Sequence, residues 1–236
     1  MLYGEAFRSP YGSELYFQSG FLLGEPNLKP EVIQTTEGQL NLEDEFMRLG
    51  LTFYHSETTD TIGRSDALGT NTFVNLADEV TFNGVEFEAD IRIDSDWRIQ
   101  SSYSFQNNKD DYGQKQVMPA HQKMLKAGVV YSGIAGMEWG LWNTYLGAAS
   151  KVEDLKNQNT MIVNPEAQSV NLLSLNMSMN VGQTFAIPFL NRTEASLFAN
   201  NLLDEKVFFP ELGRRVVNTY PQSHERNVYL SLQVSF

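Results

Sequence analysis

The last eleven residues, RNVYLSLQVSF (226–236), alternate between two kinds of side chain. The residues at one set of alternate positions are all apolar, and they are Val228, Leu230, Leu232, Val234 and Phe236. The residues between them are mostly small and polar, and they are Tyr229, Ser231, Gln233 and Ser235. Because successive side chains of a strand point to opposite faces, this segment predicts a β-strand with one apolar and one polar face.

The same alternation recurs upstream in FMRLGLTFYH (46–55), GVEFEADIRID (84–94), WRIQSSYSF (97–105) and LLSLNMSMNV (172–181). Strands of a soluble β-sandwich alternate in this way as well. Several of these runs, however, reach the roughly 9–11 residues that a membrane strand needs, whereas soluble strands centre on about 5–6. We expect the stretch 73–94 to form one very long strand.

Ten strands are predicted, at 2–8, 30–41, 45–55, 73–93, 97–109, 121–132, 137–149, 169–181, 193–205 and 226–236. The connections after odd-numbered strands are long, namely 9–29, 56–72, 110–120, 150–168 and 206–225, whereas those after even-numbered strands are mostly short, with 182–192 as the exception. Long loops on one side and tight turns on the other are typical of outer-membrane barrels. The fold class is therefore all-β, an antiparallel transmembrane β-barrel portion.

Composition limits the function classes. The 236 residues carry a formal net charge of -12 and no cysteine. This acidic balance argues against a nucleic-acid partner, which requires a basic surface. No apolar run is long enough for a transmembrane helix, and the first residues lack the features of a signal peptide. No motif for a catalytic nucleophile, metal or phosphate is found, so we expect neither an enzyme nor a cofactor.

Three segments resemble the TonB-dependent outer-membrane receptor family. They are LYGEAFRSPYGSELY (2–16), GEPNLKPEVIQTTEGQL (24–40) and the closing stretch from NLLDE to the C-terminal Phe (201–236). Glu25 stands where the family usually has Asn, and Glu225-Arg226 stands where Gly-Arg is usual.

The resemblance implies that residues 1–236 are the C-terminal part of a barrel of about 22 strands with a plugged lumen. The plug and about twelve strands would then be absent. It further implies a Gram-negative outer-membrane location, contact with lipid, and uptake of an iron–siderophore complex. The energy-coupling partner TonB would act through the absent N-terminal part, and the barrel-assembly machinery would read the last strand. The alternatives are a complete ten-stranded outer-membrane protein, such as an omptin-like enzyme or an adhesin, and a soluble β-sandwich.

Ligand-binding candidates come from the long loops, because Arg suits the multidentate recognition of oxygen-rich anions and aromatic side chains add contact area. These candidates are Arg64, Tyr112, Arg214 and Arg215, and each of them also fits the role of an ordinary polar loop residue. Charged residues on the polar phase of the strands would face the lumen, and they are Arg48, Glu86, Glu88, Asp90, Arg92 and Arg98. The three histidines, His55, His121 and His224, lack metal-ligand spacing and are expected at strand–loop junctions.

Overall fold

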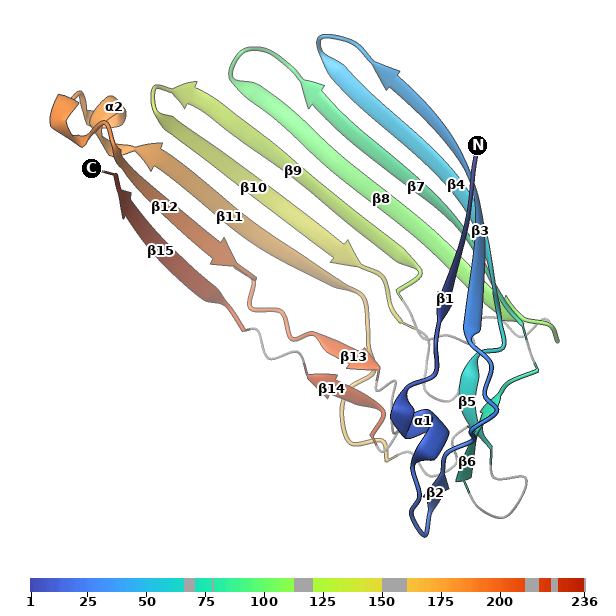
Figure 1. The fold of residues 1–236 in the computed structure, drawn as a ribbon. Helices are drawn as coiled ribbons and strands as arrows, with labels where there is room; N and C mark the ends of the chain where they lie inside the picture. Colours follow the sequence, from blue (N-terminus) through green and yellow to red (C-terminus); the bar gives the residue numbers. More distant parts are fainter. Residues whose placement is uncertain are drawn as a thin grey trace. The chain divides into compact units, whose positions relative to one another are not determined.

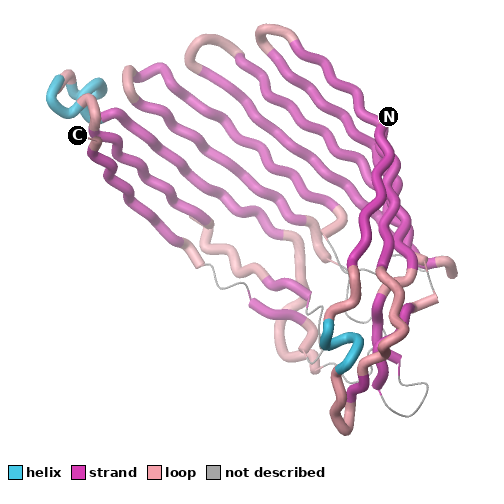
Figure 2. Tube along the Cα trace, in the orientation of Figure 1, coloured by secondary structure: helices cyan, strands magenta, loops and turns pink. Residues whose placement is uncertain are grey.

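The computed structural model describes residues 1–65, 71–77, 79–112, 121–149, 161–210, 217–221 and 225–235. Strands dominate it, and helical structure is confined to a few short stretches (Figure 2). These are α1 (Gly12–Tyr16), α2 (Val181–Phe185) and the 3₁₀ turn η2 (Pro188–Leu190). Within the described ranges, every helix is too short and too polar to cross a membrane.

A ten-stranded sheet contains all ten predicted strands (Figure 1). In sheet order they are β1 (Leu2–Arg8), β3 (Glu31–Glu43), β4 (Met47–Thr59), β7 (Val80–Arg92), β8 (Trp97–Asp110), β9 (Lys123–Ile134), β10 (Met137–Leu146), β11 (Val170–Asn180), β12 (Thr193–Asn200) and β15 (Asn227–Val234). Neighbours follow one another along the chain and pair antiparallel wherever the register is resolved.

The chain divides into two compact units, which are described separately. The first contains Met1–Gln39, Thr52–Val85 and Gln106–Met118. The second contains Leu40–Leu51, Glu86–Phe105 and Pro119–Phe236.

Cross-strand register sorts the side chains of the second unit onto two faces. Trp97 lies opposite Tyr131, which lies opposite Trp139, and the row continues through Met177 and Leu197 to Leu230. The Trp97 and Tyr131 ring centroids are 4.6 Å apart with the ring planes tilted by 40°, an aromatic contact that stabilises the row. Leu230 is 80% exposed, although it lies on this apolar face. Trp97 is also exposed and the four residues between are half-buried. A continuous apolar row that is this accessible indicates a surface that meets something other than water.

Two of the short connections form as predicted and are closed by aspartate side chains. Asp44 Oδ1 accepts hydrogen bonds from the backbone N–H groups of Phe46 and Met47, both at 2.8 Å. Asp94 Oδ1 does the same for Asp96 and Trp97, again at 2.8 Å. A short Asx side chain that bonds its own backbone two or three residues ahead favours a tight turn, which explains why Asp recurs here.

The prediction of a single strand over 73–93 is wrong. The segment forms β6 (Asn71–Asn75) and, after a break, β7. At the break, the Asn75 side chain accepts a hydrogen bond from Lys29 N at 2.8 Å and donates to the carbonyl oxygens of Lys29 and Asp60. These bonds tie the end of β6 to the segments around Lys29 and Asp60. β6 belongs to a three-stranded sheet, whereas β7 belongs to the ten-stranded sheet.

The predicted strand 193–205 also ends early, at Asn200. Asn201 and Asp204 adopt φ values of 50° and 59°, in the left-handed region that a continuing strand does not use. The Asn201 side chain bonds both N and O of Glu205, which closes the turn. Asn201 thus bonds its own local backbone where the strand ends, whereas the Asp204 side chain accepts from Arg226 N, 22 residues further along the chain.

The long loops contain small elements that alternation did not predict. They are β2 (Leu22–Leu23) and β5 (Ile62–Ser65), which join β6 in a three-stranded sheet, and the pair β13 (Phe208–Pro210) and β14 (Thr219–Pro221). The exceptional connection 182–192 contains α2 and η2, in which Asn180 caps α2 by accepting from Gln183 N.

The family-like motifs of the first unit meet in one hydrogen-bonded group. Arg8 Nε donates to Glu31 at 2.5 Å, and Arg8 Nη1 donates to Glu14 at 2.9 Å. Glu14 also accepts from Tyr11 N at 2.7 Å, and Glu31 accepts from Ile62 N at 2.7 Å. Because the carboxylates bind backbone donors as well as the guanidinium, they fix the loop after β1 against the start of β3.

A clamp in the second unit joins two further loops. Asn218, which is 4% exposed, accepts hydrogen bonds from Val163 N and Asn164 N and donates to Asn164 O at 2.6 Å. Asn164 Nδ2 donates to Thr219 O at 2.6 Å in return. The two side-chain amides thus join residues 163–164 to residues 218–219 by hydrogen bonds that regular strand pairing would otherwise supply.

We predict that Gly84→Ala lowers stability. The Tyr54 ring lies directly over Gly84, so a β-carbon there would overlap the ring. Overpacking of this kind costs about 1–3 kcal/mol. Gly38→Ala is the matched control, because Gly38 also lies in a strand and a β-carbon there meets nothing within 4 Å. The temperature at which the folded band disappears in semi-native electrophoresis should fall for Gly84→Ala alone. Equal behaviour of the two variants would contradict the packing argument.

We also predict that Asn218→Ala releases the loop clamp without unfolding the sheet. The variant removes the acceptor of two part-buried hydrogen bonds, from Val163 N and Asn164 N, at a cost of about 0.5–1.5 kcal/mol each. Hydrogen exchange should therefore accelerate at Val163 and Asn164 and stay unchanged in β11 and β12. Asn143→Ala is the control, because it removes an exposed amide pair with Asn171. Unchanged exchange at Val163 would show that the clamp is not required.

Candidate functional site

A groove of about 560 Å³ lies on the polar face of the second unit. Its lining comes from six successive strands of the sheet, β3, β4, β7, β8, β9 and β10. Arg48, Glu88 and Asp90 line it together, which confirms that these predicted inward charges share one face. Glu86 lies beside Glu88 in a neighbouring hollow of the same unit.

The charges of the groove are partly paired. Arg48 Nη2 lies 2.7 Å from Glu43, and Arg98 Nε lies 3.4 Å from Asp90. Gln100 Nε2 donates to Asp90 at 2.9 Å. Exposed pairs of this kind contribute little to stability because water and salt screen them. Their arrangement fits a wet surface that presents alternating charges to a polar partner.

Trp142 is the largest side chain of the groove, and sequence reasoning did not single it out. Its indole lies over Gly128, the residue opposite it on β9, where a β-carbon would overlap the ring. Lys126 Nζ lies 5.0 Å from the indole centroid, within cation–π range. The signal was available, because Trp142 falls on the polar phase of β10 and pairs with a glycine.

The predicted ligand residues lie on separate elements. Arg64 lies in β5 opposite Phe73, with its guanidinium carbon 5.3 Å from the ring centroid. Tyr112, just beyond β8, is 75% exposed. Arg214 and Arg215 lie outside the described residues. Arg64 is therefore a loop cation held in one orientation by an aromatic face.

The histidines differ from expectation in one respect. His55 lies inside β4, because that strand continues to Thr59 rather than ending at residue 55. Its Nδ1 lies 2.8 Å from Asn83 Oδ1, and its Nε2 lies 3.1 Å from Glu57. His121 lies at a strand–loop junction as predicted, bridged to Ala149, and its Nδ1 lies 2.5 Å from Gly147 O. His224 lies outside the described residues. Within the part of the chain that the structure describes, no three potential metal-ligating side chains cluster together.

The polar face and the loops both offer polar surfaces on which a partner could bind. The polar face offers a hydrated groove of paired charges, and the loops offer aromatic and cationic side chains at the opposite end of the strands from the tight turns. Small molecules are bound in such settings by a few polar groups in an otherwise aromatic or apolar lining.

Solved structures share this fold. The copper transporter OprC matches with a TM-score of 0.71 at 16% identity, over 99% of this chain and 36% of that chain. The ferric enterobactin receptor PfeA of Pseudomonas aeruginosa matches with 0.70 at 14% identity, over 99% and 37%. The pyoverdine receptor FpvA of P. aeruginosa PAO1 matches with 0.69 at 17% identity, over 99% and 33%. This chain thus spans about a third of each, and at these identities the likeness shows the fold.

No curated protein matches the sequence. A family model does, the one described as TonB dependent receptor-like, beta-barrel, and its match extends over residues 2–202. The motifs that resemble this family at Leu2–Tyr16 and Gly24–Leu40 fall inside the match. The chain belongs to the TonB-dependent receptor family and forms part of its β-barrel.

Proposed function

We propose that residues 1–236 are the C-terminal part of an outer-membrane receptor that takes up an iron–siderophore complex, driven by TonB. The observation that carries this proposal is the family match over residues 2–202, together with solved receptors of which this chain spans about a third. The rest of such a receptor would supply the plug and the segment that contacts TonB.

The two faces of the sheet support this assignment. In a barrel wall the apolar face, with Trp97, Tyr131 and Trp139, would meet lipid. The polar face, with its groove and Trp142, would face the lumen. β15 alternates up to its end and would be the strand that the barrel-assembly machinery reads.

The substrate class rests on narrower support. PfeA is described as a ferric enterobactin receptor and FpvA as a pyoverdine receptor, whereas OprC is described as a copper transporter. The loop candidates Arg64 and Tyr112 fit an anionic, oxygen-rich chelate. An iron chelate is therefore the proposed substrate, and a copper complex is the outcome that would replace it.

A transport assay tests the proposal. The gene carrying this chain is deleted and restored in its host, and uptake of ⁵⁵Fe from a panel of ferric siderophores is measured with and without TonB. We expect uptake of at least one ferric siderophore to be lost on deletion and also without TonB. Loss of copper uptake instead would reassign the substrate, and unchanged uptake of both would contradict the proposal.

Arg64→Gln should weaken binding of that siderophore about tenfold, which corresponds to one charge-assisted hydrogen bond of about 1.5 kcal/mol. Lys29→Gln is the matched control, because Lys29 is another exposed cation of the first unit; its side chain is 72% exposed and its Nζ lies 3.7 Å from Asp60 Oδ1. Affinity is measured on purified receptor by fluorescence quenching. Equal affinities for Arg64→Gln and the control would remove Arg64 from the binding site.

A further inference from the structure

A belt of polar side chains crosses one face of the first unit near the loop ends of its strands. Its members are Glu5 on β1, Gln34 on β3, His55 and Glu57 on β4, and Asn83 on β7. We call this set the polar belt. Neither the lumen groove nor the loop candidates include any of these residues.

The polar belt lies on the face of the strands opposite the one that carries Thr35 and Ser56. Thr35 and Ser56 share a hydrogen bond of 2.8 Å, and Ser56 is 6% exposed. Because side chains alternate along a strand, His55 and Glu57 point to the other face, as does Gln34. Glu5 pairs with Gln34 across β1 and β3, and it therefore shares that face.

The belt is organised as two hydrogen-bonded groups. Gln34 Nε2 donates to Glu5 at 3.0 Å, and the Tyr3 hydroxyl donates to Glu5 at 3.4 Å. His55 bonds Asn83 and Glu57 through its two ring nitrogens. The His55 and Glu57 side chains remain 48% and 47% exposed. They are thus tied to one another yet open to whatever covers this face.

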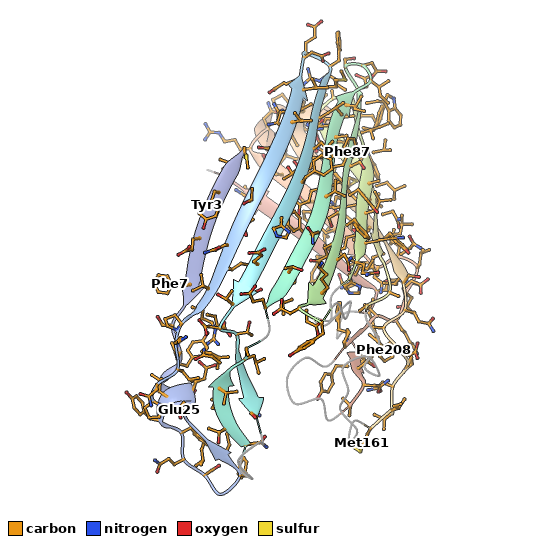
Figure 3. All side chains as sticks on the ribbon, turned by 90° about the vertical axis from the view of Figure 1, so that its right-hand side faces the viewer. Tyr3, Phe7, Glu25, Phe87, Met161 and Phe208 are labelled. Carbon is orange, nitrogen blue, oxygen red and sulfur yellow. The ribbon has the colours of Figure 1, made fainter. Side chains whose placement is uncertain are left out.

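On β4, the same face becomes apolar on the tight-turn side of His55. Phe53, two residues before His55 on β4, is 53% exposed. On β1, Tyr3 and Phe7 project to one side of the strand (Figure 3), and alternation places Glu5 on that side between them. Tyr3, opposite Thr36, lies on the tight-turn side of Glu5, and Phe7, opposite Val32, lies on the loop side. Two residues correspond to only about 7 Å along a strand. A face that changes from an exposed Phe to a His–Glu pair over that distance marks a sharp change in its surroundings.

Membrane physics explains such a step. A charged side chain on the lipid face of a barrel costs about 2–4 kcal/mol at the bilayer midplane but only about 0–1 near the interface. Phosphate and hydroxyl groups of lipid headgroups offer acceptors and donors that match imidazole, carboxylate and amide groups. An aqueous face would not explain the exposed Phe53, and a hydrocarbon face would not accommodate Glu57.

We infer that the polar belt contacts the lipid headgroup layer on the long-loop side, and that the hydrocarbon edge crosses β4 between Phe53 and His55. The inference rests on the proposed function, because it requires this face to meet a membrane. It adds a lipid-headgroup contact site and a defined depth for the first unit.

Single-cysteine labelling measures that depth, since these 236 residues contain no cysteine. Phe53→Cys, His55→Cys and Glu57→Cys are made in the membrane-purified protein that carries this chain. Each is spin-labelled in lipid nanodiscs, and its accessibility to dissolved oxygen is compared with its accessibility to a water-soluble nickel chelate. Thr52→Cys, on the opposite face of β4, is the control for position along the strand.

The label at position 53 should favour oxygen, and the ratio of oxygen to nickel accessibility should fall severalfold at positions 55 and 57 to the value of the headgroup layer. If 55 and 57 match 53, or match free water, the inference is overturned while the membrane assignment stands. If position 53 is itself as accessible to nickel as bulk water, the face does not meet lipid and the proposed function fails. If His55→Cys fails to fold, the label at Glu57→Cys still reports the accessibility of the same layer.

Discussion

Residue-by-residue backbone pairing is the constraint on which the rest of this structure depends. A backbone N–H or C=O group of a strand that has no access to water must bond to the neighbouring strand. The hydrogen-bond ladder from β8 to β15 therefore fixes which side chains lie in one row. Trp97, Tyr131 and Trp139 meet because their backbones pair, and Gln100, Gly128 and Trp142 meet for the same reason. A shift of one residue anywhere would place an apolar row on the polar face. The two faces are therefore a consequence of register, and any function assigned to either face inherits that dependence.

Where the ladder stops, side chains take over its role. Arg8, Glu14 and Glu31 satisfy one another and two backbone N–H groups beyond β1. Asn218 does the equivalent for Val163 and Asn164. Charged groups suit the first position and amides the second, because an amide can donate and accept at once in a buried site. Loops built in this way present fixed surfaces, which is what recognition of a ligand at strand ends requires.

Alternation in the sequence predicted the ten strands because it reports directly which face a residue occupies. It does not report which strand is the partner. The break at Asn75 was missed for that reason, since Asn75 bonds Lys29, which lies 46 residues earlier in the chain. The small strands β13 and β14 are three residues each, too short for a period of two to be visible. Arg64 was proposed as a ligand residue from its chemistry alone. Its contact with the Phe73 ring depends on the pairing of β5 with β6, which no local sequence pattern reveals. Trp142 was not singled out because only charged residues on the polar phase of the strands were considered, although Trp142 occupies that phase on β10.

Aromatic rings on the polar face follow a common rule in each unit. Tyr54 lies over Gly84 in the first, and Trp142 lies over Gly128 in the second. A glycine on the neighbouring strand lets the ring lie against the backbone, which covers backbone that would otherwise be exposed and recovers the packing that glycine lacks. A ring held flat projects less from the sheet than one that stands upright. Lys126 above Trp142 then adds a positive charge to a low aromatic surface. Gly128 therefore leaves the space that the indole occupies, and a larger residue at that position would have to displace the Trp142 ring, which lines the groove.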